Sequence, residues 1–319
     1  MSTDTMALEV EDLTVHAGGA VPVGLVRGVS FALRRGEVLG LVGESGSGKT
    51  LTALSLLRLV PAGLEQRGVV RIGGRAIESL SERDMRRLRG SEISMVFQDP
   101  MTALNPVRTI GSYLSEVARR HLKQSRGDAR RRVTDALRAT GIPSPEQRFG
   151  SYPHQLSGGL RQRAMIALAL LNDPAVIVAD EPTTALDSTI QAQILDLLRS
   201  RLHQSALLLV THDLGVAREI CDRIAVMYAG RIVEHGPAAQ VLEEPRHPYT
   251  VGLLRAAPRF DRDRRPLVPI PGDPPQPATI GPGCAFAPRC PRADDRCRTT
   301  RPELVAFGEA SAACWNPHE

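Results

Sequence analysis

The chain has few aromatic residues, few cysteines and almost no lysine. Phe, Trp and Tyr make up 3% of its 319 residues, so Leu, Val, Ile and Ala must form most of the core. Only two of its forty basic residues are lysine, Lys49 and Lys123. A lysine kept in an arginine-rich chain indicates a site that needs a compact ammonium rather than a broad guanidinium.

Long apolar runs are also missing. The longest, residues 164–171 and 206–210, fall far short of the about 20 residues that a membrane-spanning helix needs. The first 13 residues are acidic and lack the basic start of a secretory signal. We therefore expect a cytoplasmic protein. Its net charge of +5 gives no indication of nucleic-acid binding, because arginines alternate with acidic residues along most of the chain.

A glycine-rich loop is the most informative segment. Residues 37–50 read EVLGLVGESGSGKT, a buried strand running into the pattern G-x-x-x-x-G-K-[ST], and a leucine-rich helical segment follows. Backbone N–H groups of such a loop surround phosphate oxygens, the lysine reaches the β and γ phosphates, and the threonine hydroxyl ligates Mg²⁺. The predicted ATP-binding residues here are Gly43, Glu44, Ser45, Gly46, Ser47, Gly48, Lys49 and Thr50.

Two adjacent carboxylates end a second apolar strand. Residues 174–182 read PAVIVADEP and place Asp180 and Glu181 at the strand terminus. Behind a phosphate-binding loop, Asp180 is expected to hold Mg²⁺, and Glu181 is expected to polarise the attacking water.

A second anion site is predicted at the start of a long helix. The segment LSGGLRQR places Ser157, Gly158 and Gly159 directly before that helix. Free N–H groups at a helix N-terminus attract phosphate, so one chain carries two phosphate-binding segments.

The order of these segments resembles the ATP-binding cassette (ABC) ATPases. VFQDP around Gln98 is similar to their Q-loop, TTALD ending at Asp187 to their D-loop, and LLLVTHD to the strand before their switch histidine, here His212. The resemblance implies two cassettes facing head to tail, with each ATP held by one chain's Lys49 loop and the other chain's Ser157 segment. It implies Glu181, His212 and Gln98 as catalytic residues, Asp187 at the ATP site, and Thr50, Gln98 and Asp180 at Mg²⁺.

Fold class and organisation follow from alternating strand and helix patterns. They predict an α/β P-loop nucleotide-binding domain with a β-rich N-terminal part and a parallel core. We expect the cassette over residues 1–255, with a helical insert at about 102–170, and an extension over residues 256–319. A chromosome-type ABC ATPase would carry a long coiled coil between Gln98 and Ser157, but these residues are too close in the sequence for one. A translation-factor type would carry two cassettes, whereas this chain has one G-x-x-x-x-G-K-[ST] motif. The class that remains is the energy-coupling subunit of a membrane transporter.

The segment after the cassette narrows the transporter class. EEPRHPYTVGLLRAAP, residues 243–258, closely resembles a segment of oligopeptide and dipeptide importer ATPases. The resemblance implies an ATPase on the cytoplasmic face of a bacterial or archaeal membrane. Its implied partners are a second, related ATPase, two transmembrane permeases and an extracytoplasmic substrate-binding protein. Importers of nickel chelates or glutathione share much of this sequence, and a soluble regulatory ABC ATPase is a further alternative.

Four of the five cysteines lie near the end of the chain. Seven prolines between residues 266 and 282 predict an extended linker, and the spacing C-x₅-C-x₆-C-x₁₆-C follows. A reducing cytosol disfavours disulfides, and four thiolates suit Zn²⁺ or an iron–sulfur cluster. The importer resemblance implies a [4Fe–4S] cluster, with zinc as the alternative. The expected ligands are Cys284, Cys290, Cys297 and Cys314, and the expected charge-balancing residues are Arg289, Arg292, Arg296 and Arg298.

Overall fold

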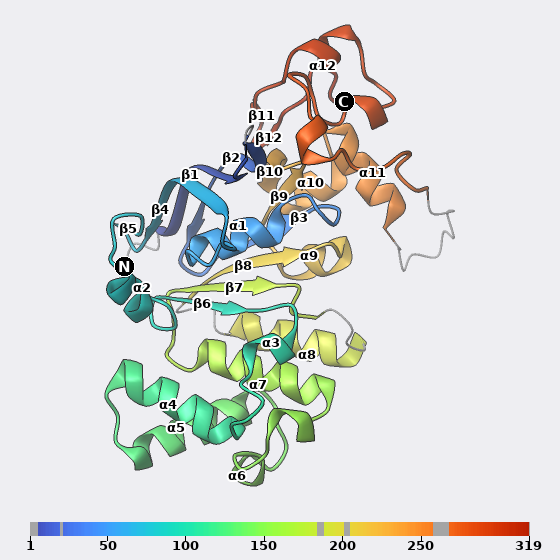
Figure 1. The fold of residues 1–319 in the computed structure, drawn as a ribbon. Coiled ribbons are helices and arrows are strands. Elements are labelled where there is room, and N and C mark those ends of the chain that lie inside the picture. Colours follow the sequence, from blue (N-terminus) through green and yellow to red (C-terminus); the bar gives the residue numbers. More distant parts are fainter. Residues whose placement is uncertain (1–5, 20–21, 184–187, 201–204, 258–267, 319) are drawn as a thin grey trace. The chain divides into compact units, whose positions relative to one another are not determined.

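The computed structural model describes residues 6–19, 22–183, 188–200, 205–257 and 268–318 (Figure 1). The chain divides into two compact units. The first comprises residues 1–8, 33–37 and 71–208, and the second comprises residues 9–32, 38–70 and 209–319. Sequence boundaries of these units fall within β1 (Met6–Ala17), β2 (Val23–Arg34), β4 (Leu64–Ile72) and β8 (Ala206–Thr211).

The first unit is mainly helical around two buried parallel strands. β6 (Ile93–Val96) pairs in parallel with β7 (Val176–Asp180), from Ile93 opposite Val176 to Val96 opposite Ala179. Its other elements are β5 (Arg75–Ala76), α2 (Glu82–Leu88), α3 (Pro100–Ala103), α4 (Ile110–Leu122), α5 (Arg126–Ala139), α6 (Pro145–Arg148), η1 (Pro153–Gln155), α7 (Gly158–Leu170) and α8 (Ser188–Ser200).

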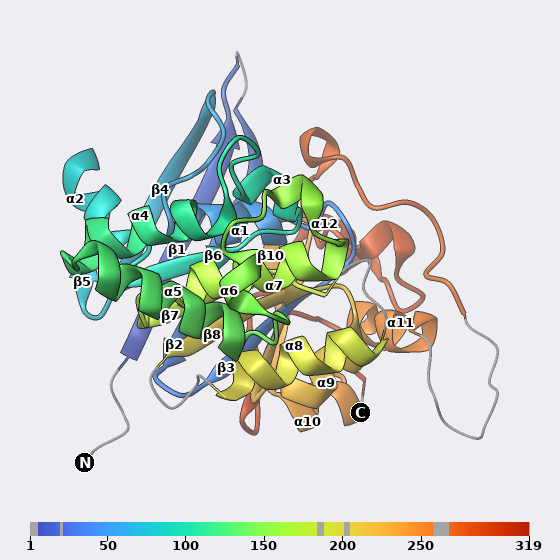
Figure 2. The same cartoon turned by 90° about the horizontal axis from the view of Figure 1, so that it is seen from below.

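Helices α4 and α5 form where the apolar spacing predicts helices. Buried residues recur every four positions, at 110, 114 and 118 in α4 and at 129, 133 and 137 in α5. The hydroxyls of Thr109 and Ser125 cap the two N-termini by accepting backbone N–H bonds. The two helices lie side by side (Figure 2). Their buried residues form one apolar core with those of α7.

The second unit contains the glycine-rich loop and most of a mixed sheet. β3 (Val38–Val42) pairs in parallel with β9 (Arg223–Tyr228), which confirms the parallel core. The remaining helices are α1 (Lys49–Leu56), α9 (Leu214–Ile220), α10 (Ala238–Glu243) and α11 (Pro248–Ala256). β2, β1 and β4 neighbour one another in that order in a separate sheet.

One strand departs from the parallel pattern. β10 (Arg231–Pro237) returns antiparallel to β9 through Ala229 and Gly230, which both have positive φ, 46° and 81°. A two-residue loop with this backbone joins only antiparallel strands. The alternation of strands and helices in the sequence did not reveal this hairpin.

The C-terminal extension continues this sheet. Its elements are η2 (Pro277–Thr279), η3 (Ala287–Arg289), α12 (Asp295–Thr299), β11 (Val305–Phe307) and β12 (Ala310–Ala312). β12 pairs antiparallel with β10, so the order within this unit is β11-β12-β10-β9-β3. The sequence had predicted a linker and a cysteine cluster but neither of these strands.

The described part of the chain contains no helix with the length and hydropathy of a membrane span.

Candidate functional site

The glycine-rich loop joins the buried strand β3 to helix α1. Gly43 has a φ of 154°, and a Cβ there would lie 2.2 Å from the carbonyl oxygen of Met227, so no side chain fits. Gly48, with a φ of 104°, caps α1 in the left-handed conformation. The loop therefore has the geometry that the motif predicts, with Thr50 exposed in the first turn of α1.

Lys49 turns back over this loop. Its side chain is 5% exposed, and its ammonium Nζ donates to the carbonyl oxygens of Gly43 and Glu44 at 2.8 and 2.9 Å. The flexible stem of lysine brings one compact ammonium to both carbonyl oxygens. A planar guanidinium is broader and would place its N–H groups differently. The ammonium is thus held at the mouth of the loop where phosphate oxygens are expected.

Gln98 and Glu181 meet in the first unit. Gln98 follows β6 and Glu181 follows β7, and the ends of neighbouring parallel strands bring the two side chains together. The amide Nε2 of Gln98 donates to Oε2 of Glu181 at 2.9 Å. Glu181 has a φ of 47°, an uncommon conformation for a non-glycine residue that is frequent at functional sites. Asp180, one residue earlier, is 2% exposed.

Ser157 caps helix α7 in the same unit. Its Oγ accepts the N–H of Leu160 at 3.4 Å. A Cβ at Gly158 would meet no heavy atom of the described residues within 4 Å. Packing within the described part of the chain therefore does not explain this glycine, which is exposed at the helix terminus.

Two predicted residues remain, His212 and Asp187. His212 follows β8 in the second unit and is exposed. Asp187 lies outside the described residues.

The four clustered cysteines line one small cavity with His247 and Trp315. Burial raises the pKa of each thiol, to about 11 for Cys314. In the described part of the chain, however, no group of three or more His, Cys, Asp or Glu side chains is placed to hold a metal ion. The predicted metal centre is therefore not supported. Cys221 is 8% exposed at the end of α9, with a pKa raised by burial to about 12, as expected for a structural thiol.

Comparison with known proteins decides the family. Residues 26–184 match the ABC transporter family, and residues 233–297 match the C-terminal region of oligopeptide/dipeptide transporters. The oligopeptide transport ATP-binding protein OppD of Salmonella typhimurium is 46% identical over 318 residues, which cover 98% of this chain and 94% of that protein. The chain belongs to the oligopeptide/dipeptide ABC transporter ATP-binding family.

Other similar proteins support the same family assignment. The dipeptide transport ATP-binding protein DppD of Bacillus subtilis is 46% identical, across 97% of this chain and 94% of its own length. OppD of Mycobacterium tuberculosis is 47% identical, but the chain spans only about half (51%) of its length. The dimeric bacterial ABC transporter cassette MJ0796 superposes with a TM-score of 0.65 at 27% identity, covering 72% of this chain and 98% of that one.

Sequence reasoning missed one feature of this oligopeptide/dipeptide family chain. An ion pair joins the C-terminal extension to the glycine-rich loop, residues 43–50, which we call the ATP loop. Arg289, whose side chain is 5% exposed, donates through both terminal nitrogens to the Glu44 carboxylate at 2.7 and 3.0 Å. This bidentate bond to Glu44 raises the pKa of Arg289. The available signal was that Glu44 is the one acidic residue between Gly43 and Thr50.

The arginines near the cysteines agree with the expectation only at Arg292, whose charge partly offsets the rise that burial causes in the pKa of Cys290. Arg289 neutralises Glu44 rather than the thiols. Arg296 stacks on the Trp315 ring, 3.3 Å from its centroid, and the Nε of Arg292 donates to the Asn316 carbonyl. Only Arg298 is without a described role.

The HPYT segment, residues 247–250, lies in the stretch that resembles the importer ATPases. This segment also supports the ATP loop. Nδ1 of His247 accepts the N–H of Tyr249 and caps α11. Tyr249 is fully buried, and its hydroxyl accepts the backbone N–H of Glu44 at 2.8 Å. The Phe286 ring packs against Tyr249 and Tyr228, with centroids 5.4 and 5.3 Å apart. The extension and α11 thus hold Glu44 by its side chain and its backbone.

Replacing Tyr249 with phenylalanine tests this support. The change leaves the N–H of Glu44 without its acceptor, and a buried unpaired donor costs about 1–3 kcal/mol. We expect chemical denaturation to show a loss of that size, together with weaker ATP binding. Tyr113→Phe, which removes the same hydroxyl from a half-buried tyrosine of α4, is the control and should change stability little. Equal stabilities for the two variants would contradict the role of the Tyr249 hydroxyl.

Proposed function

We propose that this protein is the ATP-hydrolysing subunit that powers import of di- and oligopeptides through separate membrane permeases. One observation carries the proposal: the segment matching the oligopeptide/dipeptide C-terminal region packs onto Glu44 of the ATP loop through Tyr249 and Arg289. The part of the chain that marks the peptide family is therefore in contact with the part that binds phosphate.

In the proposed site, the N–H groups of residues 43–50 and the Lys49 ammonium hold the ATP phosphates. The Thr50 hydroxyl, the Asp180 carboxylate and the Gln98 amide oxygen are hard oxygen donors, which fit Mg²⁺. When bound, Mg²⁺ offsets phosphate charge. Glu181 accepts the proton of the attacking water, and Gln98 orients that carboxylate through the amide hydrogen bond.

We further propose that the working unit contains two cassettes. Ser157, Gly158 and Gly159 at the start of α7 would contact ATP held by the other cassette, joined by Asp187 and His212. The open space beside Gly158 supports this arrangement. The second cassette is proposed to be a related but different ATPase, and the assembly to include two permeases and a substrate-binding protein. The chain would then lie at the cytoplasmic face of the membrane, with the cassette in residues 1–255.

The experiment is isolation of the tagged chain from its native membrane, followed by peptide uptake. We expect two permeases and a second ATPase to co-purify. A deletion strain should lose uptake of labelled di- and oligopeptides, and the wild-type gene should restore it. Normal peptide uptake in the deletion strain, or a chain that purifies with no membrane subunit, would overturn the proposal.

We also propose that residues 284–314 hold an iron–sulfur cluster. The four thiols line one cavity, and four cysteine thiolates are the usual ligand set of such a cluster. Such a group would cross-link the segments that carry the four cysteines. Burial keeps the thiols protonated, so loading would release protons.

Metal analysis of anaerobically purified protein tests the cluster. We expect iron, sulfide and visible absorbance in the wild type, and a large loss of iron in Cys290→Ser. The control is Cys221→Ser, which removes the one cysteine outside the cluster and should keep its iron. Colourless protein with one zinc ion per chain would identify the alternative metal and contradict the cluster.

A further inference from the structure

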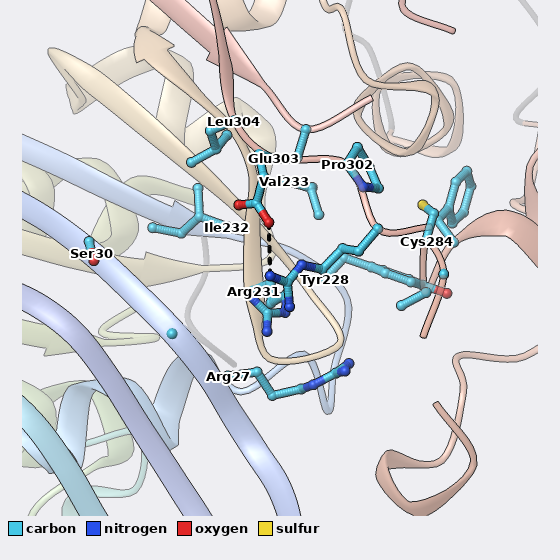
Figure 3. Close-up of a pocket in the computed structure, with 16 residues that line it drawn as sticks. Arg27, Ser30, Tyr228, Arg231, Ile232, Val233, Cys284, Pro302, Glu303 and Leu304 are labelled. Atoms are coloured by element: carbon cyan, nitrogen blue, oxygen red, sulfur yellow. Dashed lines mark hydrogen bonds and ion pairs between the residues drawn. The ribbon is translucent and has the colours of Figure 1, made fainter. Parts of the chain in front are cut away.

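A second polar cavity lies in the unit that contains the ATP loop. It has a volume of about 240 Å³ and is lined by strand β2, the β9–β10 hairpin and the extension (Figure 3). None of the residues 43–50 lines it, so it is separate from the phosphate-binding loop. The hairpin is nevertheless shared: Gly230 accepts the N–H of Arg27, and its own N–H donates to the carbonyl of Ser47.

Positive charge dominates the lining of this cavity. Arg27, Arg231 and Arg301 face it, and Glu303 is the one acidic lining residue, which leaves a net charge of +2. Glu303 is paired with Arg301 at 2.8 Å, as the dashed line in Figure 3 marks. Among the described residues, Arg27 and Arg231 form no ion pair, although the charges of Glu303 and Asp12 attract Arg231.

Arg231 is the best-placed ligand-binding group. Its Nε is buried and has no hydrogen-bond partner within the described part of the chain. Because Nε itself is covered, a ligand in the cavity would meet this guanidinium through its terminal nitrogens. Burial, reinforced by the charges of Arg301 and Arg27, lowers the pKa of Arg231 to about 10. Burial and Arg301 also lower the pKa of Arg27.

We propose that this cavity binds a phosphomonoester dianion. Two negative charges balance the net charge of the lining, and guanidinium groups recognise phosphate oxygens through paired N–H bonds. The volume exceeds that of a phosphate group, and Ile232, Leu304 and Phe286 supply an apolar wall for an attached organic group. The ligand is therefore a small phosphorylated compound with an apolar part.

Binding of phenyl phosphate, measured by titration calorimetry, tests the proposal. The whole protein is first saturated with Mg²⁺ and a non-hydrolysable ATP analogue, so that the P-loop does not compete for the probe. We expect saturable binding that Arg231→Gln weakens at least about tenfold, since a hydrogen bond to a charged group has a large effect on affinity. Arg27→Gln should weaken it in the same direction and serves as the second variant if Arg231→Gln does not fold.

The matched control is Arg298→Gln, which removes an exposed arginine of the same extension and should leave binding unchanged. Vesicles containing phosphatidic acid form a second arm, because that lipid presents the same phosphomonoester. Binding to vesicles but not to phenyl phosphate would assign the dianion to a lipid headgroup. Equal affinity in the wild type and the folded Arg27 and Arg231 variants, or no saturable binding of either probe at about 1 mM, would overturn the site.

Discussion

Replacing Glu181 with glutamine is expected to lower the rate of ATP hydrolysis by about 10²–10⁴-fold, the usual contribution of a positioned general base. The amide cannot accept the proton of the attacking water. ATP binding should survive, because the proposed phosphate ligands lie in residues 43–50. Steady-state phosphate release and equilibrium binding of a fluorescent ATP analogue measure the two effects separately.

The control for this variant is Glu92→Gln. Glu92 is exposed, and its carbonyl accepts the N–H of Val176 at the opposite end of the β6–β7 pair. The control changes the same charge in the same unit but away from the carboxyl ends of these strands, so turnover should stay near the wild-type rate. Near-normal turnover in Glu181→Gln would show that another group is the base.

The second large effect is expected from the ion pair between Arg289 and Glu44. Arg289→Gln removes a bidentate, almost fully buried partner of the ATP loop. We expect ATP affinity to fall about tenfold, or ~1.4 kcal/mol, because the loop is no longer preorganised for phosphate. Isothermal titration with the ATP analogue measures this change, and Arg298→Gln again serves as the exposed control.

A double-mutant cycle isolates the pair from other consequences of each change. Glu44→Gln, Arg289→Gln and the double variant are compared by chemical denaturation. We expect a coupling free energy of about 1.5–3 kcal/mol, the range for hydrogen bonds to charged groups. Additive losses, with no coupling between the two positions, would mean that the contact does not stabilise the loop.

The phosphate-binding loop could be predicted from sequence because all its determinants are local. Gly43, Gly48 and Lys49 lie within seven residues, and the strand and helix on either side follow from short apolar patterns. The same holds for α4 and α5, whose buried residues recur at helical spacing. Local propensity and periodicity report such features well.

The support behind that loop could not be predicted in this way. Glu44 and Arg289 are 245 residues apart in the chain, and no periodicity links two positions at that distance. The pairing of β12 with β10 has the same cause, since a strand of three residues gives almost no pattern. The Ala229–Gly230 turn was readable in principle, but alternating strands and helices favoured parallel connections.

The contact between Glu44 and the extension limits which segments can be exchanged between related cassettes. A chain ending near residue 255 would keep every residue of the ATP motif. It would nevertheless lose Arg289 and Phe286, exposing the rings of Tyr228 and Tyr249 and leaving the Glu44 carboxylate without its cation. A chimera that takes its extension from a relative therefore needs a matching pair of charges at positions 44 and 289. The extension and the ATP loop that it supports should therefore be transferred together.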